Sequence, residues 1–467
     1  MKIVRINDIK WFLKDEALVD FVKAVSCEGV TKRGHFAVER EGKKVFIKYF
    51  KEKGFFGLLR NRVTPRGKKE FYLAGRLISL SIPTPEPLGY GISDTGSYVI
   101  QEWIDGNTFV NAYTEDIEKN TLLLQLAAFL NELKFHRIRH NDLHLNNIIV
   151  HKDRLYLVDL HKMKIKNTFS LSDEISNLAH ATTMLYQDLS EEEKRTFFRQ
   201  YSDKGIKESL EAELKRLRRR WILKKMERAF DDTSTMVKDR DQVFIAGFEG
   251  YGKGALRSVI KEDKKVKVER YSDHVRKIYR NKRRLNRAWK NHIALTYLNL
   301  RVVPQAFFVK RPSLTEKGFI AMEDLAGKGE ELDRYLDREY DRFGLHERRV
   351  FIDALYAFFV HAIKQWICHR DMKACNVFIL RDGGFVLLDV EDIVFTEMDT
   401  EFLKKMLIQL NTTIPKRVST GDRIRFFLKL SVPLKMKNKA LFREVIAESL
   451  KGKIVYEGVS GLNVEQW

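Results

Sequence analysis

Two segments of this 467-residue chain repeat one pattern of polar residues, and the repeat constrains the fold more than any other feature of the sequence. In each segment an Asp follows a His by two residues, an Asn follows that Asp by five, and a hydrophobic run then ends in another Asp. The residues are His140, Asp142, Asn147 and Asp159 in the first half, and His369, Asp371, Asn376 and Asp389 in the second. Asp142 and Asp371 lie 229 residues apart, close to half the chain length, which indicates an internal duplication into two domains.

The residue types of the repeat suit the transfer of a phosphoryl group. An Asp two residues after a His can accept the proton of an attacking hydroxyl, and this is the role we expect for Asp142 and Asp371. The Asn and the final Asp supply the hard oxygen ligands that magnesium on nucleotide phosphates requires. These ligands would be Asn147 and Asp159 in the first copy, and Asn376 and Asp389 in the second. The alternative is two solvated loops that match by chance, which a second copy makes a poor explanation.

Composition and charge limit the classes of partner. A hydrophobic content of 44% and a charged content of 32% are typical of a globular protein rather than a disordered one. The net charge of +21 indicates anionic partners: a nucleotide, a phosphorylated glycolipid, a membrane surface or a nucleic acid. A basic but otherwise ordinary surface is the simpler alternative. We expect no nucleic-acid partner, because the chain has no stacking-aromatic module and no zinc-ligand spacing.

Cysteine usage and hydropathy predict a cytoplasmic protein. The three cysteines cannot all pair and form no Cys-x-x-Cys motif, which favours a reducing compartment. The amino-terminal residues show no hydrophobic region of a signal peptide. The most apolar run, residues 350–367, is interrupted by Asp353, His361 and Lys364, and this pattern predicts a buried helix instead of a membrane span. Any contact with a membrane should therefore be peripheral.

The first half begins with the pattern of a small β-rich lobe. Apolar runs at residues 36–38 and 45–48 predict strands, and the second of them carries Lys48. A basic, Gly-containing loop is expected next, up to residue 67, and residues 68–80 then show the periodicity of a helix with Glu70 near its start. Lys48 and Glu70 are candidates for an ion pair, although each is also one of the many charged residues of the chain.

The rest of the first half predicts a mainly helical lobe. Residues 98–106 predict a strand that ends at a turn, and residues 120–135 predict an amphipathic helix that leads into the first repeat. Residues 207–230 form a helical pattern dense in Lys and Arg. This helix either lies on anionic lipid or, as we favour, connects two domains with a solvated basic face.

A polar break at residues 231–235 marks the expected domain boundary, so the predicted domains are residues 1–230 and 231–467. In the second half, residues 284–298 predict the helix that corresponds to 68–80 in the first half. Residues 318–325 predict a strand that corresponds to 98–106, and residues 350–366 predict the helix before the second repeat.

The chain resembles the lipopolysaccharide core heptose kinases, the WaaP/InaA-type branch of the protein-kinase-like fold. The resemblance rests on the strand around Lys48, on the helix segment Lys69-Glu70-Phe71-Tyr72, on Ile138-Arg139-His140-Asn141-Asp142, and on Val158-Asp159-Leu160-His161. It covers about residues 25–230, and a second copy covers about residues 240–430. It implies an α+β fold made of two tandem bilobal kinase-like domains, each with a small β-rich lobe and a helical lobe.

The resemblance also implies an activity. The chain would be a phosphotransferase that uses ATP and Mg²⁺ to phosphorylate a sugar hydroxyl, of the heptose or Kdo type, in the lipopolysaccharide inner core. The lipid-linked acceptor would place it at the cytosolic face of the inner membrane, in peripheral contact with an anionic surface. The alternatives are a small-molecule or protein kinase, and a non-catalytic pseudokinase scaffold in at least one copy.

Site residues follow from the resemblance position by position. In the first copy Lys48 and Glu70 would hold the nucleotide phosphates, Asp142 would be the base, and Asn147 and Asp159 would bind the metal. The hinge that meets the adenine would include Glu102, Trp103 and Ile104 in the first copy, and Met322 and Glu323 in the second. In the second copy Asp371 would be the base, with Asn376 and Asp389 as metal ligands. Lys373 in the second copy, and His144 in the first, occupy the place of a lysine that steadies the transferred phosphate.

The second copy departs from the family pattern in its small lobe. Its phosphate-binding lysine is either Lys277, which fits the local sequence, or Lys267, which fits the distance from a Gly-rich segment. The position that matches Glu70 falls near Lys290 or Asn291, where no carboxylate is available. Without that ion pair the lysine should be less well positioned, so the second copy is expected to be either a weakened kinase or a scaffold.

Overall fold

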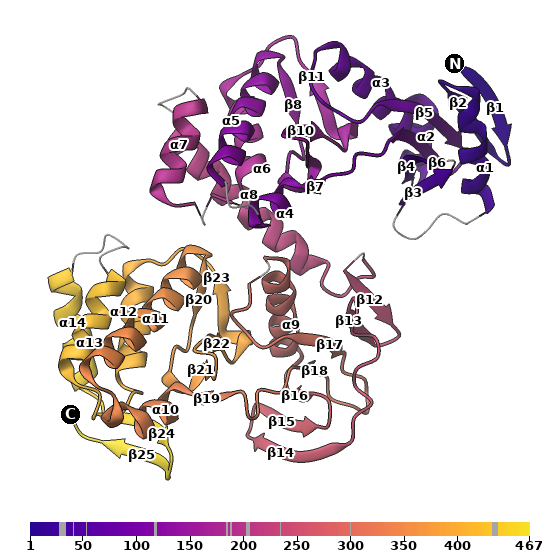
Figure 1. The fold of residues 1–467 in the computed structure, drawn as a ribbon. Helices are drawn as coiled ribbons and strands as arrows, with labels where there is room; N and C mark the ends of the chain where they lie inside the picture. The colour runs from indigo at the N-terminus through magenta and orange to yellow at the C-terminus, as the bar shows by residue number, and fades with distance from the viewer. Residues whose placement is uncertain are drawn as a thin grey trace. The chain divides into compact units, whose positions relative to one another are not determined.

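The computed structural model describes residues 1–27, 34–40, 42–52, 54–115, 119–183, 185–186, 189–201, 206–233, 235–298, 300–431 and 438–467. The chain forms two compact units, Met1–Arg218 and Arg219–Trp467 (Figure 1). The change of unit falls inside helix α8 (Lys207–Glu227), whereas the predicted boundary lies after that helix, at residue 230. Both units mix α-helices and β-strands, as the α+β prediction states.

Unit 1 begins with an antiparallel sheet of six strands in the order β1-β2-β5-β6-β4-β3. The strands are β1 (Lys2–Ile6), β2 (Ile9–Leu13), β3 (His35–Arg40), β4 (Lys43–Lys51), β5 (Pro87–Ser93) and β6 (Gly96–Glu102). The alternating burial of β2 follows its alternating apolar residues, and Trp11 and Leu13 pack with Val45 and Ile47 in one core. Helix α1 (Val19–Cys27) comes after β2 and before β3 in the chain.

Two helices lie between β4 and β5. Helix α3 (Arg66–Ser79) confirms the helix predicted for residues 68–80, and its buried face includes Glu70 and Phe71. Helix α2 (Gly54–Val63) occupies the segment for which we expected a loop, and that prediction is wrong. The two glycines of α2 concealed the helical pattern of its apolar residues, because glycine has a low helix propensity.

The second lobe of unit 1 is mainly helical. It contains the helices α4 (Phe109–Glu115), α5 (Lys119–Phe135), α6 (Leu171–Thr182), α7 (Glu191–Tyr201) and the first part of α8. Between α5 and α6 lie the short strands β8 (Ile138–His140), β9 (Ile148–His151), β10 (Arg154–Leu157) and β11 (Met163–Ile165), with the 3₁₀ turns η2 (Leu145–Asn147) and η3 (Leu160–Lys162). Strand β7 (Asn107–Thr108) pairs with β9. Apolar residues of α5 and α8, among them Leu126, Leu130, Leu214 and Leu217, share the largest core of the unit.

Unit 2 repeats the sheet of unit 1 with one strand more. Its antiparallel order is β12-β13-β17-β18-β16-β15-β14, and the first six of these correspond to the six strands of unit 1. The strands are β12 (Met236–Asp239), β13 (Gln242–Ile245), β14 (Leu256–Glu262), β15 (Val266–Tyr271), β16 (Val275–Tyr279), β17 (Ala306–Lys310) and β18 (Phe319–Met322). Helix α9 (Lys282–Tyr297) follows β16 as α3 follows β4, and it confirms the helix predicted for residues 284–298.

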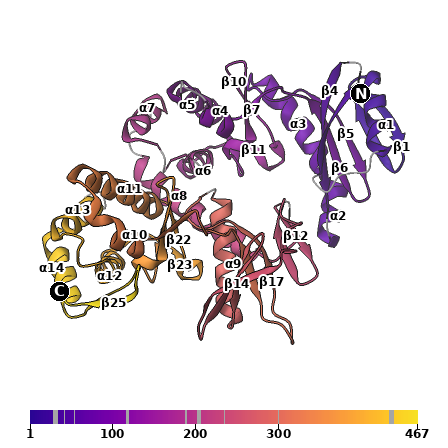
Figure 2. The same ribbon diagram turned by 60° about the horizontal axis from the view of Figure 1, so that its bottom comes forward.

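The helical lobe of unit 2 repeats the order of elements around the second motif. It contains α10 (Leu332–Glu339), η4 (Tyr340–Arg342), α11 (Leu345–Lys364), α12 (Thr400–Asn411), α13 (Thr420–Ser431) and α14 (Asn438–Leu450). Its short strands and turns are β19 (Gly329–Glu331), β20 (Ile367–His369), η5 (Ala374–Asn376), β21 (Val377–Leu380), β22 (Phe385–Leu387), η6 (Val390–Asp392) and β23 (Ile393–Phe395). A hairpin of β24 (Ile454–Gly458) and β25 (Gly461–Glu465) follows (Figure 2).

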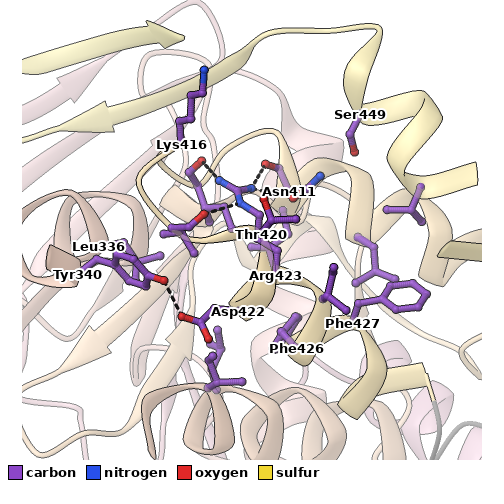
Figure 3. Close-up of a pocket in the computed structure, with 18 of the residues that line it drawn as sticks. Leu336, Tyr340, Asn411, Lys416, Thr420, Asp422, Arg423, Phe426, Phe427 and Ser449 are labelled. Carbon is purple, nitrogen blue, oxygen red and sulfur yellow. Dashed lines mark hydrogen bonds between the residues drawn. The ribbon is translucent and has the colours of Figure 1, made fainter. Parts of the chain in front are cut away.

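The helical lobe of unit 2 also contains a cavity of about 350 Å³. Apolar residues of α10 to α14 form most of its wall, and the Arg423 guanidinium donates to the backbone oxygens of Val418, Asn411 and Pro415 at its edge (Figure 3). None of the predicted site residues lines this cavity, so it is separate from the repeated motif. In the described part of the chain, no helix has the length and apolar character needed to cross a membrane.

Candidate active site

His140 organises the loop that carries the first Asp-x₄-Asn motif. The Asp142 backbone N–H donates to His140 Nδ1 (3.2 Å), so Nε2 carries the ring proton and donates to the Asp159 carbonyl (3.1 Å). Burial lowers the pKa of His140 to about 4, and the imidazole is therefore neutral at physiological pH. The ring thus joins the backbone of the predicted base to the backbone of the predicted metal ligand.

Asp142 lies beside a lysine that the sequence analysis did not single out. Lys162 Nζ bonds the Asp142 carboxylate, and the Asn147 amide donates to the Asp142 carbonyl (2.9 Å). Burial alone would raise the pKa of Asp142, but the hydrogen bond and charge of Lys162 outweigh it and hold that pKa below the usual range. The carboxylate is therefore ionised, as a proton acceptor must be.

Lys48, Glu70 and Asp159 meet at one point, although they come from strand β4, helix α3 and the loop after β10. Lys48 Nζ lies 3.4 Å from Glu70 Oε2 and 2.5 Å from Asp159 Oδ1. The Glu70 side chain is fully buried, and burial raises its pKa despite the charge of Lys48. The structure therefore brings together the lysine, the helix carboxylate and the strand-end aspartate of the first copy.

Asp159 has a left-handed backbone (φ 61°, ψ 51°), which few non-glycine residues adopt. His161 Nδ1 lies 2.5 Å from its Oδ1 and 3.7 Å from Glu70 Oε2. Burial would raise the pKa of Asp159, but His161 and Lys48 together hold it far below the usual range. Asp159 is thus anionic, and the Asn147 amide nitrogen is already engaged, which leaves the Asn147 oxygen and the Asp159 carboxylate as hard donors that suit Mg²⁺.

The predicted hinge residues of unit 1 lie at the end of β6 and just after it, and some of their backbone groups are already hydrogen-bonded within the protein. The Glu102 N–H donates to the Glu86 carbonyl (2.9 Å), so this donor is engaged within the protein. The Trp103 ring is half-buried, with Lys44 Nζ 4.1 Å from its centroid. In unit 2 Met322 ends β18, and the Glu323 N–H donates in the same way to the Gln305 carbonyl (2.8 Å). Ile104 accepts from the Gly106 N–H (3.1 Å).

The second motif repeats most contacts of the first, except that His369 Nε2 bonds the Leu388 carbonyl (3.0 Å) and not that of Asp389. The Asp371 N–H donates to His369 Nδ1 (3.3 Å), and the Asn376 amide donates to the Asp371 carbonyl (2.7 Å). Asp389 is also left-handed (φ 50°, ψ 52°). The loop in unit 2 therefore holds Asp371, Asn376 and Asp389 as unit 1 holds Asp142, Asn147 and Asp159.

The lysine of unit 2 is paired with a carboxylate that does not come from the helix. Lys277 Nζ lies 2.5 Å from Asp389 Oδ1 and 3.0 Å from Glu391. Glu391 lies two residues after Asp389, its side chain is fully buried, and it also accepts from the Tyr279 hydroxyl (3.1 Å) and from Arg284 Nε (2.9 Å). Burial would lower the pKa of Lys277, but the two carboxylates raise it, so the lysine remains protonated.

Helix α9 holds no carboxylate at the Glu70 position, as predicted, but Lys277 is nevertheless paired with a carboxylate, because Glu391 takes that place. Helices α3 and α9 end in the same way: the Leu80 N–H donates to the Arg76 carbonyl, and the Leu298 N–H donates to the Ala294 carbonyl. When these ends are superposed, Glu70 aligns with Ala288. The position predicted from the sequence, near residues 290–291, therefore lies two or three residues too late in α9. Asn291 instead bonds the Val390 and Ile393 carbonyls (2.8 and 2.9 Å), which ties α9 to the segment that supplies Glu391.

The two copies also obtain the lysine beside the base from different positions. In unit 2 Lys373 Nζ lies 3.0 Å from Asp371 Oδ2, whereas Lys162 has this place in unit 1. His144, which corresponds to Lys373, has a buried Nδ1 without a hydrogen-bond partner among the described residues. Lys267, the other candidate for the phosphate-binding lysine, pairs with Glu269 on its own strand β15, and no ion pair joins it to Asp389.

Two side chains that support the loops were missed by the sequence analysis. In unit 1 Asn177 of α6 accepts from the His140 N–H (3.0 Å) and donates to the Ile138 carbonyl (2.7 Å). In unit 2 Gln409 of α12 accepts from the Met372 N–H (2.9 Å) and donates to Asp371 Oδ1 (3.4 Å). No sequence signal marks either residue, because each comes from a helix distant in sequence and has an ordinary polar side chain.

Comparison with protein families identifies the first copy. Residues 23–201 match the family described as the lipopolysaccharide kinase (Kdo/WaaP) family. This segment is less than half of the chain, and the match does not extend to unit 2. Over residues 23–201 the first copy is therefore similar to a family of kinases, which are phosphotransferases. A search of curated proteins found no matching sequence.

Solved structures add a weak likeness. Two structures of WbdD, one described as the bifunctional kinase-methyltransferase WbdD, share 14% identity with this chain. Each match covers 46% of this chain and 53% of the other, with TM-scores of 0.28 and 0.29, so the chain spans about half the length of these structures. TM-scores this low carry no argument about fold or function.

Proposed function

We propose that the chain is an ATP- and Mg²⁺-dependent kinase that phosphorylates a sugar hydroxyl, of the heptose or Kdo type, in the lipopolysaccharide inner core. The observation that carries this proposal is the convergence of Lys48, Glu70 and Asp159 beside the Asp142 loop, within a segment that matches a lipopolysaccharide kinase family. The acceptor is lipid-linked, which places the enzyme in peripheral contact with the cytosolic face of the membrane.

The residues of unit 1 divide the work of phosphoryl transfer. Lys48, held by Glu70, neutralises the nucleotide phosphates, and Asp142 accepts the proton of the sugar hydroxyl as its oxygen bonds to the γ-phosphorus. The bond from that phosphorus to the β,γ-bridging oxygen breaks, and ADP leaves. Asn147 and Asp159 would hold Mg²⁺, which supplies charge neutralisation on the β- and γ-phosphate oxygens.

Unit 2 is proposed to be a second kinase-like domain that binds nucleotide. The Lys277–Asp389–Glu391 cluster supports this, because it keeps a protonated lysine beside the proposed metal ligand without a helix carboxylate. Asp371, Asn376 and Asp389 repeat the loop geometry of unit 1, and a pure scaffold would need none of them.

Magnesium-dependent ATP consumption with deacylated inner-core saccharide as acceptor tests the proposal. Wild type, Asp142→Asn and Asp371→Asn are compared, and loss of the base is expected to reduce turnover by on the order of 10²–10⁴-fold while ATP binding is kept. Turnover lost in one variant assigns the working unit. Absence of saccharide-stimulated turnover in a wild type that binds ATP would reject the sugar kinase in favour of a scaffold.

A further inference from the structure

Helix α2 presents large apolar side chains to solvent. Phe55, Phe56 and Val63 are 74%, 84% and 73% exposed, and Leu59 is about half exposed. At 100° per residue these four side chains fall on one side of the helix. Phe55 and Phe56 contact each other edge to face, with ring centroids 5.8 Å apart. A contiguous exposed apolar face of this kind marks a surface that binds something.

The opposite side of α2 fixes this orientation. Asn61 is buried and its amide donates to the carbonyls of Ser93 (2.8 Å) and Gly96 (3.2 Å) on the β5–β6 hairpin. Gly57, one turn earlier, packs on Glu52, and a Cβ there would lie 3.3 Å from the Glu52 carboxylate. Rotation of α2 to bury the phenylalanines would leave the Asn61 amide without its two acceptors. The sheet therefore holds the apolar side of α2 outward.

The charges beside the apolar side are positive. Arg60 and Arg62 flank it on the helix, and α2 contains no acidic residue. The nearby Glu52 carboxylate is shared by Arg60 and Arg66. Arg62 is exposed and has no ion-pair partner among the described residues, and the exposed Lys68 follows in α3. An apolar ridge flanked by cations is the pattern of a helix that lies in the interface of an anionic bilayer.

Helix α8 is the basic helix that the sequence suggested for contact with lipid, but most of its apolar side chains do not face solvent. Its apolar residues Leu214, Leu217 and Ile222 are buried. These three side chains are therefore not available to a lipid surface, and the exposed side of α8 offers its charges and the half-exposed Leu223. In Figure 2 α2 extends from the lower end of the sheet of unit 1, separate from the helical lobe of that unit.

We propose that α2 is a membrane-docking element whose phenylalanines insert between the headgroups of an anionic lipid bilayer. The ridge is a single helix about 15 Å long, which is too small to form the roughly 800 Å² per partner of a stable protein interface. Insertion into lipid needs no complementary surface, and Arg60 and Arg62 remain at the depth of the phosphate groups. This inference deepens the proposed function and depends on it only for the identity of the lipid-linked acceptor.

Cosedimentation of the full-length protein with vesicles tests the docking element. Vesicles of phosphatidylglycerol and phosphatidylethanolamine are compared with vesicles of phosphatidylcholine alone. Wild type is expected to bind the anionic vesicles, and Phe55→Ser combined with Phe56→Ser is expected to reduce the partition coefficient at least tenfold. Phe135→Ser provides the matched control, because Phe135 is 78% exposed at the end of α5 but has no place on α2.

A second measurement reports insertion directly. Phe56→Trp keeps an aromatic side chain and should bind like wild type, with added fluorescence that lipids brominated along the acyl chain quench. Equal vesicle binding by wild type and the double serine variant, absence of wild-type binding, or absence of quenching would each overturn the inference. Loss of a dimer on the serine substitutions would overturn it as well, and would identify a second copy of the chain as the occupant.

The two proposals fail independently. The double serine variant is expected to keep wild-type turnover on water-soluble, deacylated saccharide, because Phe55 and Phe56 lie outside the proposed site. Vesicle binding through α2 without any saccharide phosphorylation would reject the proposed function and support the docking element. Saccharide phosphorylation by a protein whose vesicle binding is unchanged by the α2 substitutions would support the proposed function and reject the docking element.

Discussion

Lys277 and Glu391 lie 3.0 Å apart in unit 2, and this pair corresponds to Lys48 and Glu70 in unit 1. The carboxylate has moved from the helix to the segment after the strand-end aspartate, where His161 stands in unit 1. Arg284, one turn before Ala288 in α9, bonds the same carboxylate from the helix side (2.9 Å). Each unit thus keeps a buried carboxylate beside the lysine, but the carboxylate comes from a different element in each.

We expect Glu391→Gln to destabilise unit 2. Removal of one partner from a buried ion pair costs about 3–5 kcal/mol, because the remaining cations lose their compensating charge. Glu391 compensates both Lys277 and Arg284, so the effect should appear in urea unfolding followed by fluorescence. Asp392→Asn is the matched control: Asp392 also contacts Arg284, but it is partly exposed and the loss should stay within about 1 kcal/mol. Equal destabilisation by both substitutions would contradict the special role of Glu391.

Lys162→Met should change the pH dependence of the proposed reaction. Lys162 holds the pKa of Asp142 below its usual range, so the base stays ionised at lower pH. Without this lysine the pKa of Asp142 rises, and the acidic limb of kcat/KM against pH is expected to move to higher pH. Lys164→Met, two residues later on strand β11 and exposed, should leave the profile in place. An unchanged acidic limb in Lys162→Met would show that Lys162 does not control the pKa of Asp142.

Asn147→Ala is expected to raise the magnesium concentration needed for half-maximal turnover by on the order of tenfold or more. Asn147 also bonds the Asp142 carbonyl, so a loss of activity alone would not distinguish metal binding from loop support. Asn147→Asp keeps an oxygen donor but removes the amide N–H. Recovery of the wild-type magnesium midpoint in Asn147→Asp, and not in Asn147→Ala, identifies a metal ligand. Identical magnesium midpoints in both variants would show that Asn147 supports the loop and does not bind the metal.

Stability should fall in mild acid because of His292. Burial lowers the pKa of His292 to about 4, and its Nε2 has no hydrogen-bond partner among the described residues. The ordinary pKa in the unfolded chain is about 6.5. The unfolded state therefore binds a proton that the folded state does not, and stability present above pH 6.5 is lost as the pH falls toward 4.

Thermal unfolding between pH 7 and pH 5 tests this dependence. His292→Met fills the same buried space without a titrating group, so its Tm should fall less than that of wild type over this range. His346→Met, at an exposed position of α11, should retain the wild-type slope. A slope in His292→Met as steep as in wild type would assign the acid sensitivity to other groups.

Several features were predictable because they depend on local sequence. The helices near residues 68–80, 120–135, 207–230, 284–298 and 350–366 follow from apolar periodicity, and the structure confirms them with ends shifted by a few residues. The repeat of Asp142 and Asn147 in Asp371 and Asn376 predicted two loops of the same geometry, which the structure confirms. Helix α2 was missed because its glycines hide the pattern, although Gly57 is there for close packing on Glu52.

The sequence by itself predicted the repeat, the residues of both loops and the strand that carries Lys48, but it left the lysine of the second copy open between Lys277 and Lys267. Only the tertiary structure decided which distant charges meet: Glu391 with Lys277, and Lys162 with Asp142. Spacing along the chain specifies a loop because its bonds are short-range. The partner of a buried charge is instead any opposite charge that the packing of strand, helix and loop brings within a few ångströms, and a carboxylate from either element satisfies that requirement equally well.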